Sequence, residues 1–223
     1  METMKNEMQA RMNLLKETGY NVENAKKCWD FVRGGDEIKK QEVRADRLPD
    51  GVYLIDTKGG AVLYDWRDTE SININDIAYV GIVQGSHSVA ISLRDVSEDE
   101  ITLTSKKDDG KGHYIDSYMD AVQDWNGRQN TKHLQAVGLN PAILLKDGEY
   151  IPTLAELYLI CLNQKYINAA MRFVGGQEMK GWYWSSTEYS STLAWYLYLG
   201  NGSASYTNNA THTRGVRLVR QFL

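Results

Sequence analysis

The feature that most constrains this chain is a tract near its carboxyl end that carries almost no charge. Over residues 181–213 the only formally charged residue is Glu188, and the rest is mostly Tyr, Trp, Ser, Thr, Asn and Gly. Residues 195–199 alternate in the manner of a strand. The Asn-Gly pair at 201–202 is a strong hairpin turn signal, and residues 203–206 can form the returning strand. The tract therefore predicts an antiparallel hairpin.

The alternation assigns residues 195–199 to two faces of the strand. Trp195, Leu197 and Leu199 share one face, while Tyr196 and Tyr198 share the other. The aliphatic positions satisfy the core, so the two tyrosines are surplus to it. Aromatic rings among small polar residues also make up antibody binding sites, where rigid rings supply contact area at low entropic cost. A solvated sheet face shows the same alternation, so both interpretations stay open.

Composition and charge exclude several classes of protein. The 223 residues suffice for one large domain, or for one domain with a small appendage. A net charge of −4 and a pI of about 5.6 give no general attraction to nucleic acid. Apolar runs such as residues 142–145 are far too short to span a membrane, and the polar first residues lack the apolar core of a secretory signal. We therefore expect cytoplasmic synthesis, with display on a virion or by a leaderless route, and leave the final location unassigned.

The chain is expected to divide into a helical N-terminal segment, residues 1–47, and a larger domain, residues 48–223. Apolar residues at helical spacing predict two amphipathic helices over residues 1–33, the first with a stripe of methionines. One interpretation is a helical hairpin that packs on the main domain. The other is a segment for docking to a virion or for homo-oligomerisation, because Met-rich stripes make adaptable contact surfaces. Residues 36–47 are charged and predict a solvated link.

The rest of the chain predicts a mixture of strands and helices, and hence an α+β fold. Alternating apolar residues predict strands at 52–54, 77–83 and 88–93. Apolar residues at helical spacing predict helices at 114–125, from Thr153 onwards, and at 168–174. The helix after Thr153 is expected to point Leu154, Leu157, Ile160 and Cys161 inward. Residues 105–113 predict a polar loop.

Several strings of the larger domain carry a resemblance to a known family. The matching strings are Ile151–Leu157, Ile167–Ala170, Gly175-Gly176, Tyr183–Tyr189, Ala194–Tyr196, Asn201-Gly202 and Arg214–Arg220, with Asp50–Asp56 and Asp124–Thr131 as further matches. They resemble the C-type-lectin-like domain family of bacteria and phages, which includes the variable proteins of diversity-generating retroelements. Formylglycine-generating-enzyme-like domains are its distant relatives. The resemblance covers roughly residues 50–222.

The resemblance implies a compact C-type-lectin-like fold, with two helices flanking small twisted antiparallel sheets. Its last strands and loops would display a ligand-binding face, and in retroelement-diversified members scattered codons of this tract vary on a fixed scaffold. The positions that match the scaffold are Trp184, Ser185, Ser186, Glu188, Trp195, Gly202, Val216, Arg217 and Val219. The displayed or variable positions would be Tyr183, Tyr189, Ser191, Thr192, Leu193, Tyr196, Tyr198, Ser203, Ser205, Tyr206, Asn208, Asn209, Thr211 and His212.

Catalysis and metal binding find little support in the sequence. Cys28 and Cys161 have no His or second Cys near them in sequence, which fits free thiols rather than a nucleophile. The histidines are scattered without ligand spacing, and the acidic runs at 95–100 and 108–109 predict solvated loops. We therefore expect no catalytic residue, no metal and no cofactor. Glu188 is expected to be bonded within the scaffold, because an isolated carboxylate near a core must be paired.

These observations give three hypotheses. The first is a nonenzymatic recognition protein for a protein or glycan on a cell surface, in the manner of a retroelement-diversified or a phage or bacterial receptor-binding protein. Its aromatic anchors would be of the kind that carry most interface energy. The expected anchors are Tyr183, Tyr189, Tyr196, Tyr198 and Tyr206. The second is a carbohydrate-binding lectin or adhesin subunit that uses the same face, with Asn208 and Asn209 bonding sugar hydroxyls. The third is an enzyme of formylglycine-generating type, which the placement of the cysteines disfavours.

Overall fold

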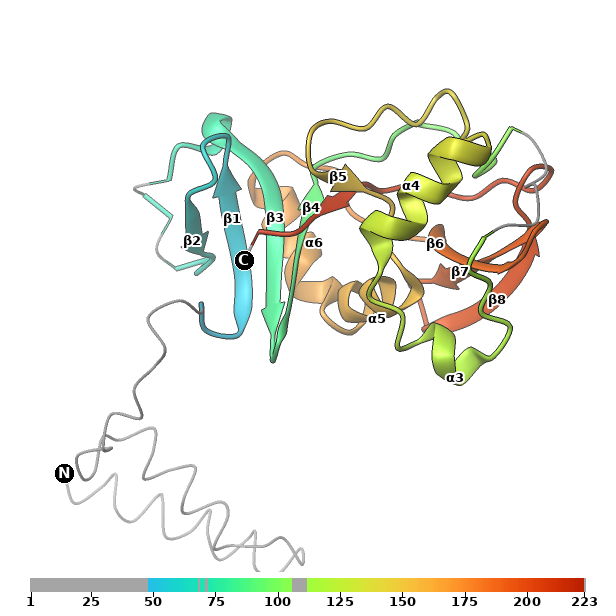
Figure 1. The fold of residues 1–223 in the computed structure, drawn as a ribbon. Coiled ribbons are helices and arrows are strands. Elements are labelled where there is room, and N and C mark those ends of the chain that lie inside the picture. Colours follow the sequence, from blue (N-terminus) through green and yellow to red (C-terminus); the bar gives the residue numbers. More distant parts are fainter. Residues whose placement is uncertain (1–47, 68, 71, 106–111, 223) are drawn as a thin grey trace, which may run out of the picture. The chain divides into compact units, whose positions relative to one another are not determined.

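The structure, a computed structural model, describes residues 48–67, 69–70, 72–105 and 112–222 (Figure 1). The helices and the link expected within residues 1–47, together with Cys28, lie outside the described residues, as does most of the loop expected at 105–113. From Leu48 onwards the described residues form two antiparallel sheets with helices packed against them. The predicted α+β class is therefore confirmed.

The larger sheet has six strands in the order β2-β1-β3-β4-β9-β5, and every neighbouring pair is antiparallel. Its strands are β1 (Gly51–Asp56), β2 (Ala61–Leu63), β3 (Ile77–Gln84), β4 (His87–Ser92), β5 (Glu149–Tyr150) and β9 (Val219–Arg220). The three strands predicted in this half of the chain overlap β1, β3 and β4. β9 enters the sheet between β4 and β5, so the carboxyl end of the described chain pairs with strands made much earlier (Figure 1).

The smaller sheet has three strands in the order β6-β7-β8. They are β6 (Trp182–Ser190), β7 (Leu193–Tyr198) and β8 (Ser203–Asn208). The turn between β7 and β8 contains the predicted Asn-Gly pair. Gly202 has a φ of +74°, which favours glycine, and the Asn201 side chain accepts a hydrogen bond from the Ser203 amide at 2.9 Å. The predicted hairpin is confirmed.

The described helices are α3 (Tyr118–Ala121), α4 (Gly127–Val137), α5 (Leu154–Leu162) and α6 (Gln164–Phe173), with a short 3-10 helix η1 at Ile74–Asp76. α5 begins where predicted because Thr153 and Glu156 form a capping box. The Thr153 hydroxyl accepts a hydrogen bond from the Glu156 amide at 3.2 Å, and the Glu156 carboxylate accepts one from the Thr153 amide at 2.8 Å. α6 begins at Gln164, earlier than the predicted Asn168.

The helix predicted at 114–125 is wrong at both ends, because only α3 within it is helical. The backbone before α3 bonds to the smaller sheet instead. The Ile115 amide donates to the Glu188 carbonyl at 2.9 Å, and the Ile115 carbonyl accepts the indole proton of Trp195 at 2.7 Å. Ser117 then caps α3 through its side chain. Tertiary hydrogen bonds thus override the apolar periodicity of this segment.

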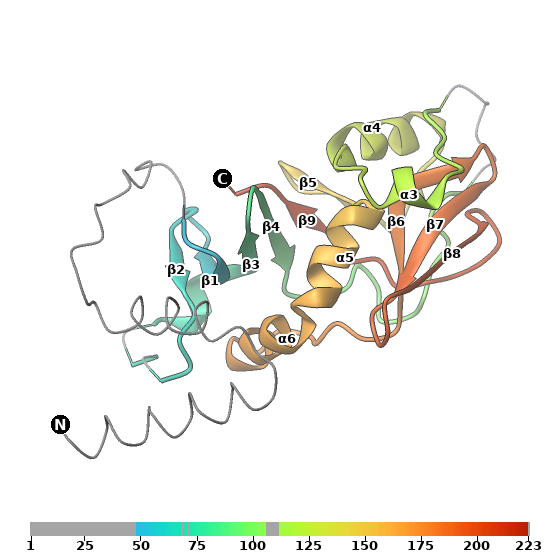
Figure 2. The same cartoon turned by 90° about the horizontal axis from the view of Figure 1, so that it is seen from below.

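α5 and α6 fix the smaller sheet against the larger one. α5 packs on β6 and β7, and α6 packs on β1 and β3 (Figure 2). Leu154, Leu157 and Ile160 of α5 are fully buried, as predicted. Cys161, also expected to point inward, is half-buried. One apolar cluster runs from the larger sheet through both helices to the inner face of β7. The smaller sheet therefore packs on the hydrophobic core of the domain.

Candidate functional site

The smaller sheet divides its aromatic side chains between two faces. Trp182 of β6 pairs with Tyr198 of β7, and Tyr198 pairs with Ser203 of β8. Trp195 pairs with Tyr206 and lies out of phase with Tyr198, so Trp195 and Tyr206 project from the opposite face. The sequence predicted one binding face. The structure corrects this to two aromatic surfaces, one on each side of the sheet.

Burial along β7 follows the predicted alternation. Trp195, Leu197 and Leu199 are 4%, 0% and 2% exposed. Tyr196 and Tyr198, on the other face, are half-buried. The assignment of these five residues to a core face and an outer face is therefore confirmed.

The first aromatic surface surrounds the Trp195 indole on the face that packs against α5. Tyr189 and Tyr206 stack with ring centroids 3.8 Å apart, and both meet the indole edge-on, at 5.5 and 5.3 Å. Tyr118 approaches the same indole at 6.2 Å and meets Tyr158 edge-on at 6.5 Å. We name these five residues the Tyr206 patch.

Hydrogen bonds hold the Tyr206 patch in place. The Trp195 indole donates to the Ile115 carbonyl at 2.7 Å, the Tyr158 hydroxyl donates to a carbonyl of the β7–β8 turn at 2.9 Å, and the hydroxyl oxygens of Tyr118 and Tyr158 lie 2.9 Å apart. Tyr118 and Tyr206 are 46% and 43% exposed, whereas the indole beneath them is buried. The buried Trp195 indole therefore forms a fixed floor of the patch, and the exposed rings of Tyr118 and Tyr206 form its accessible rim.

Two hydroxyls of the Tyr206 patch hold their protons more strongly than a free tyrosine does. Hydrogen bonding with Tyr206 raises the pKa of Tyr189. Burial raises the pKa of Tyr158, and Tyr118 adds to that shift. Neutral hydroxyls both donate and accept hydrogen bonds without the desolvation penalty of a charge. Both hydroxyls are therefore neutral at neutral pH.

The second aromatic surface lies on the opposite face of the sheet. Trp182 meets Tyr198 at 4.6 Å and Tyr196 edge-on at 5.2 Å. The guanidinium carbon of Arg214 lies 4.4 Å from the ring centroid of Tyr196 and 5.8 Å from that of Trp182. We name these four residues the Arg214 patch. The tract was expected to form a nearly uncharged face, and this side of it carries a cation.

Arg214 reaches this surface because the chain after the tract pairs with β6. The Gly215 amide donates to the Trp182 carbonyl at 2.9 Å, and the Trp184 amide donates to the Gly215 carbonyl at 3.0 Å. A Cβ atom at position 215 would lie 3.0 Å from the Tyr183 ring. Glycine therefore allows the close approach that places Arg214 beside the aromatic rings.

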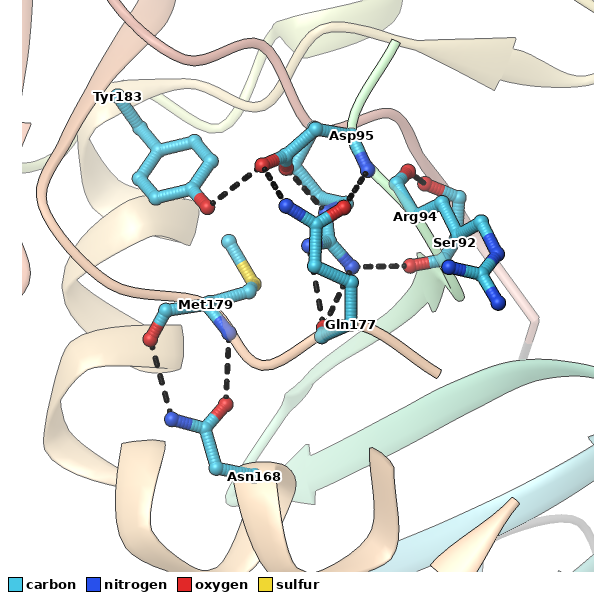
Figure 3. Close-up of polar contacts among 8 residues, drawn as sticks. Ser92, Arg94, Asp95, Asn168, Gln177, Met179 and Tyr183 are labelled. Carbon is cyan, nitrogen blue, oxygen red and sulfur yellow. Dashed lines mark hydrogen bonds and ion pairs between the residues drawn. The ribbon is translucent and has the colours of Figure 1, made fainter. Parts of the chain in front are cut away.

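Arg217, on the same segment, is fully buried and well bonded. Its Nε donates to Asp95 at 2.6 Å, and its Nη atoms donate to the carbonyls of Ser92 and Gln177 at 2.9 to 3.2 Å. Asp95 also accepts hydrogen bonds from the Gln177 side-chain amide at 2.9 Å and from the Tyr183 hydroxyl at 3.1 Å (Figure 3). We name Arg217, Asp95, Gln177 and Tyr183 the Arg217 centre.

Tyr183 is therefore not displayed, contrary to expectation. Its side chain is 2% exposed. Burial, followed by the negative charge of Asp95, raises the pKa of Tyr183 to about 12. Its neighbour Trp184 is buried as well, because most of β6 is covered on both faces. Alternation along such a strand does not separate core from surface.

Asn209 was also expected on display and is fully buried. Its Oδ1 accepts the Thr104 hydroxyl at 3.2 Å, and its Nδ2 donates to Glu188 at 3.5 Å. Glu188 is 3% exposed and lies 3.5 Å from Nε2 of His133. Asn209 is therefore part of the interior, because a buried amide must place its donors and acceptors inside the protein.

The remaining predicted residues lie at several depths. The exposed ones are Ser203, Ser205, Thr211 and His212, and the half-buried ones are Ser191, Thr192, Leu193 and Asn208. The residues matched to the scaffold are buried, apart from the half-buried turn residue Gly202. They are Trp184, Ser185, Ser186, Glu188, Trp195, Val216, Arg217 and Val219.

Four residues of the two patches were not predicted from the sequence. Tyr118 and Tyr158 lie far from the tract in sequence, and no local pattern indicates that Tyr118 meets Trp195 and that Tyr158 meets Tyr118. Trp182 lies within the tract, and its composition was the signal that could have identified it. Arg214 stands next to the tract, but the pairing that turns it toward the rings depends on tertiary contacts.

No three His, Cys, Asp or Glu side chains in the described ranges are close enough to hold a metal ion. Burial raises the pKa of the Cys161 thiol, whose Sγ donates to the Leu199 carbonyl at 3.5 Å. A raised pKa disfavours the nucleophilic thiolate. Within the same ranges, no helix has both the length and the apolar character needed to cross a bilayer.

Comparison of the chain with models of known protein families and with curated proteins finds no match. Its function is therefore inferred from the geometry of the two patches.

Proposed function

We propose that this chain is a nonenzymatic recognition protein that binds a protein ligand on a cell surface through the Tyr206 patch. The observation that carries the proposal is the arrangement of four tyrosines around a buried indole, with Tyr118 and Tyr206 more than 40% exposed. Aromatic rings are the most frequent anchors of protein interfaces. A desolvated centre surrounded by an accessible rim is the usual anatomy of such interfaces.

The patch is also ordered before any ligand arrives. Ring contacts and hydrogen bonds hold Tyr158, Tyr189 and Trp195 in place. Each side chain that is already fixed avoids an ordering cost of about 0.5–1.5 kcal/mol on binding. This preorganisation favours recognition by a rigid surface.

A glycan ligand is less well supported for this patch. That hypothesis needed Asn208 and Asn209 to bond sugar hydroxyls. Asn209 is buried with both ends of its amide engaged, and Oδ1 of Asn208 accepts the Ala210 amide at 3.1 Å. A protein ligand requires neither residue.

The proposal extends to the fold and to its diversification. We propose a C-type-lectin-like domain, and the burial of Trp184–Glu188 and Val216–Val219 supports a fixed scaffold beneath the displayed positions.

Retroelement diversification is tested by comparing the coding region with a nearby imperfect repeat. Differences confined to template adenines support it, and differences elsewhere refute it. Attachment or oligomerisation through residues 1–47 concerns residues outside the described ranges and stays a prediction.

The function is tested by capturing ligands from cell-surface extracts on the full chain and measuring their affinity for variants. The test variant is Tyr118→Ala/Tyr206→Ala. The matched control is Tyr166→Ala, because Tyr166 is a 63% exposed tyrosine of α6 outside both patches. Truncating anchors costs about 2 kcal/mol or more, so the double variant should bind about 30-fold more weakly. The control should stay within about twofold of the unchanged chain.

The comparison of the double variant with the control can also contradict the proposal. If the folded double variant binds the captured protein as tightly as the control does, the Tyr206 patch is not the binding surface. Thermal unfolding of each variant shows whether it is folded. A loss of affinity shared by the control would also remove the patch from consideration.

A further inference from the structure

The Arg214 patch holds a cation that has no acidic partner among the described residues. Each ion pair of the described chain within 4.0 Å involves other side chains. In that part of the chain, Nη1 of Arg214 donates to the Thr213 carbonyl at 2.5 Å, while its buried Nε has no hydrogen-bond acceptor. A guanidinium carries five N–H donors in a planar fork. Arg214 therefore keeps a positive charge that no carboxylate of the described residues neutralises, although its Nε is too buried to reach an external group.

The rest of the patch supplies a group of neighbouring aromatic rings with hydroxyls beyond it. The rings of Trp182, Tyr196 and Tyr198 lie next to one another on β6 and β7. Ser203 and Ser205 of β8 are exposed and pair directly with Tyr198 and Tyr196. From the segment of Arg214 to β8 the patch crosses about three strand spacings, roughly 14 Å. A cation, apolar ring faces and hydroxyls therefore occur in that order across the sheet.

We propose that the Arg214 patch binds a carboxylate-bearing sugar, that is, a residue of an acidic glycan. The carboxylate would accept hydrogen bonds from the guanidinium, which matches carboxylate geometry. The aromatic rings would pack against the apolar face of the sugar ring, and the serine hydroxyls would bond hydroxyl groups of the neighbouring residues of the glycan.

The single charge favours a carboxylate over a phosphate. Proteins that recognise phosphorylated partners usually gather several arginines around the dianion. The Arg214 patch offers one guanidinium, which matches a monoanion. This site lies on the opposite face of the sheet from the Tyr206 patch and does not depend on the function proposed there.

The test is a calorimetric titration of the full chain with two probes, trigalacturonic acid and sialyllactose. Each probe is paired with its methyl ester, which keeps the ring and removes the charge. The acids should bind with a Kd of about 1 mM or tighter. The esters should bind about tenfold more weakly, because hydrogen bonds to a charged group are the strong ones. Binding by one acid alone identifies which type of acidic sugar the patch accepts.

Variants locate the binding on the molecule. Arg214→Met keeps an aliphatic stem over Tyr196 and removes the charge, so the acid should bind about tenfold more weakly. The matched control is Arg128→Met, because Arg128 also lies over a tyrosine ring, 5.8 Å from the centroid of Tyr150, but outside the patch. The control and Tyr206→Ala should leave the affinity unchanged.

Several results overturn the proposal. They are no binding of either acid at about 10 mM, equal binding of acid and ester, an unchanged affinity in the folded Arg214→Met variant, or an equal loss in Arg128→Met. Tighter binding of a phosphotyrosine peptide than of either acid would assign the patch to a different ligand. None of these results bears on the Tyr206 patch, which is tested with its own variants.

Discussion

Arg214 and Arg217 belong to one short segment and have different environments. Arg217 is fully buried, and its Nε and both Nη atoms donate to protein acceptors. Arg214 lies over the Tyr196 ring, and its Nε donates to nothing in the described part of the chain. Residue type does not distinguish the two. The presence of an acidic partner does, because Asp95 pairs with Arg217 and no carboxylate of the described residues pairs with Arg214.

The physical difference lies in what surrounds each charge. Asp95, the partner of Arg217, is itself only 11% exposed, so both charges depend on each other in a nearly closed site. Removing one partner of a buried pair leaves an uncompensated charge. A guanidinium over an aromatic ring near the surface contributes about 0.5–1 kcal/mol. The two arginines should therefore respond very differently to the same substitution.

The largest expected effect is that of Arg217→Met. This change leaves the Asp95 carboxylate without its cation and should lower the free energy of unfolding by about 3–5 kcal/mol. Arg214→Met should lower it by less than about 1 kcal/mol. Urea unfolding followed by circular dichroism measures both values. Equal losses would abolish the distinction between the two arginines.

The next comparison is between the floor and the rim of the Tyr206 patch. Trp195→Ala removes a buried indole and should lower the free energy of unfolding by about 3 kcal/mol or more. Tyr206→Ala removes a ring that is 43% exposed and should lower it by about 1 kcal/mol. The same urea experiment tests the pair. A larger loss for Tyr206→Ala would show that this ring belongs to the core.

A smaller effect is expected from Tyr183→Phe in the Arg217 centre. Removing the hydroxyl that donates to Asp95 should lower the free energy of unfolding by about 1 kcal/mol. The folded chain also raises the pKa of Tyr183 from 10.0 to about 12. Because the folded state holds this proton more strongly than the unfolded state, its contribution is complete below pH 10.0 and is lost as the pH rises toward about 12.

Unfolding measured from neutral pH upwards tests this pH dependence. Tyr183→Phe should lose less stability than the unchanged chain between pH 10.0 and about pH 12. Parallel curves for the two proteins over that range would show that Tyr183 does not contribute to the alkaline loss.

The smallest effect, and one of opposite sign, is expected from Ser186→Ala. The Ser186 hydroxyl is buried without a hydrogen-bond partner, whereas the Ser185 hydroxyl donates to the Trp195 carbonyl at 2.9 Å. Removing an unsatisfied hydroxyl should leave the stability unchanged or raise it by up to about 1 kcal/mol, while Ser185→Ala should lower it by about 1 kcal/mol. Thermal unfolding of both variants measures these two changes in stability. A clear loss for Ser186→Ala would indicate a bond through bound water.

Local signals in the sequence predicted a good part of the fold. The Asn-Gly turn, the alternation of β7 and the start of α5 at Thr153 depend on neighbouring residues, and all three are confirmed. The helix predicted at 114–125 failed because its first residues bond to β6 and β7, which are distant in sequence. The depth of Tyr183 and Asn209 likewise depends on partners far along the chain, Asp95 and Thr104.

The candidate site was predictable only in part, for a geometric reason. The composition of the tract indicated the smaller sheet, but it could not show that Tyr206 pairs with Trp195. Because of that pairing, the Tyr206 side chain lies on the opposite face of the sheet from Tyr196. A shift of one residue in register moves a side chain to the other face. Assigning displayed residues therefore needs the pairing of the strands as well as their sequence.

The position of β9 has a consequence for how the protein is made. β4 and β5 leave the ribosome long before β9, yet they join one sheet only through Val219 and Arg220. Until those residues emerge, the nascent chain exposes unpaired edges of β4 and β5, which can associate with other chains. We therefore expect the larger sheet to close only after β9 has emerged, and slow translation before that point to increase the need for a chaperone.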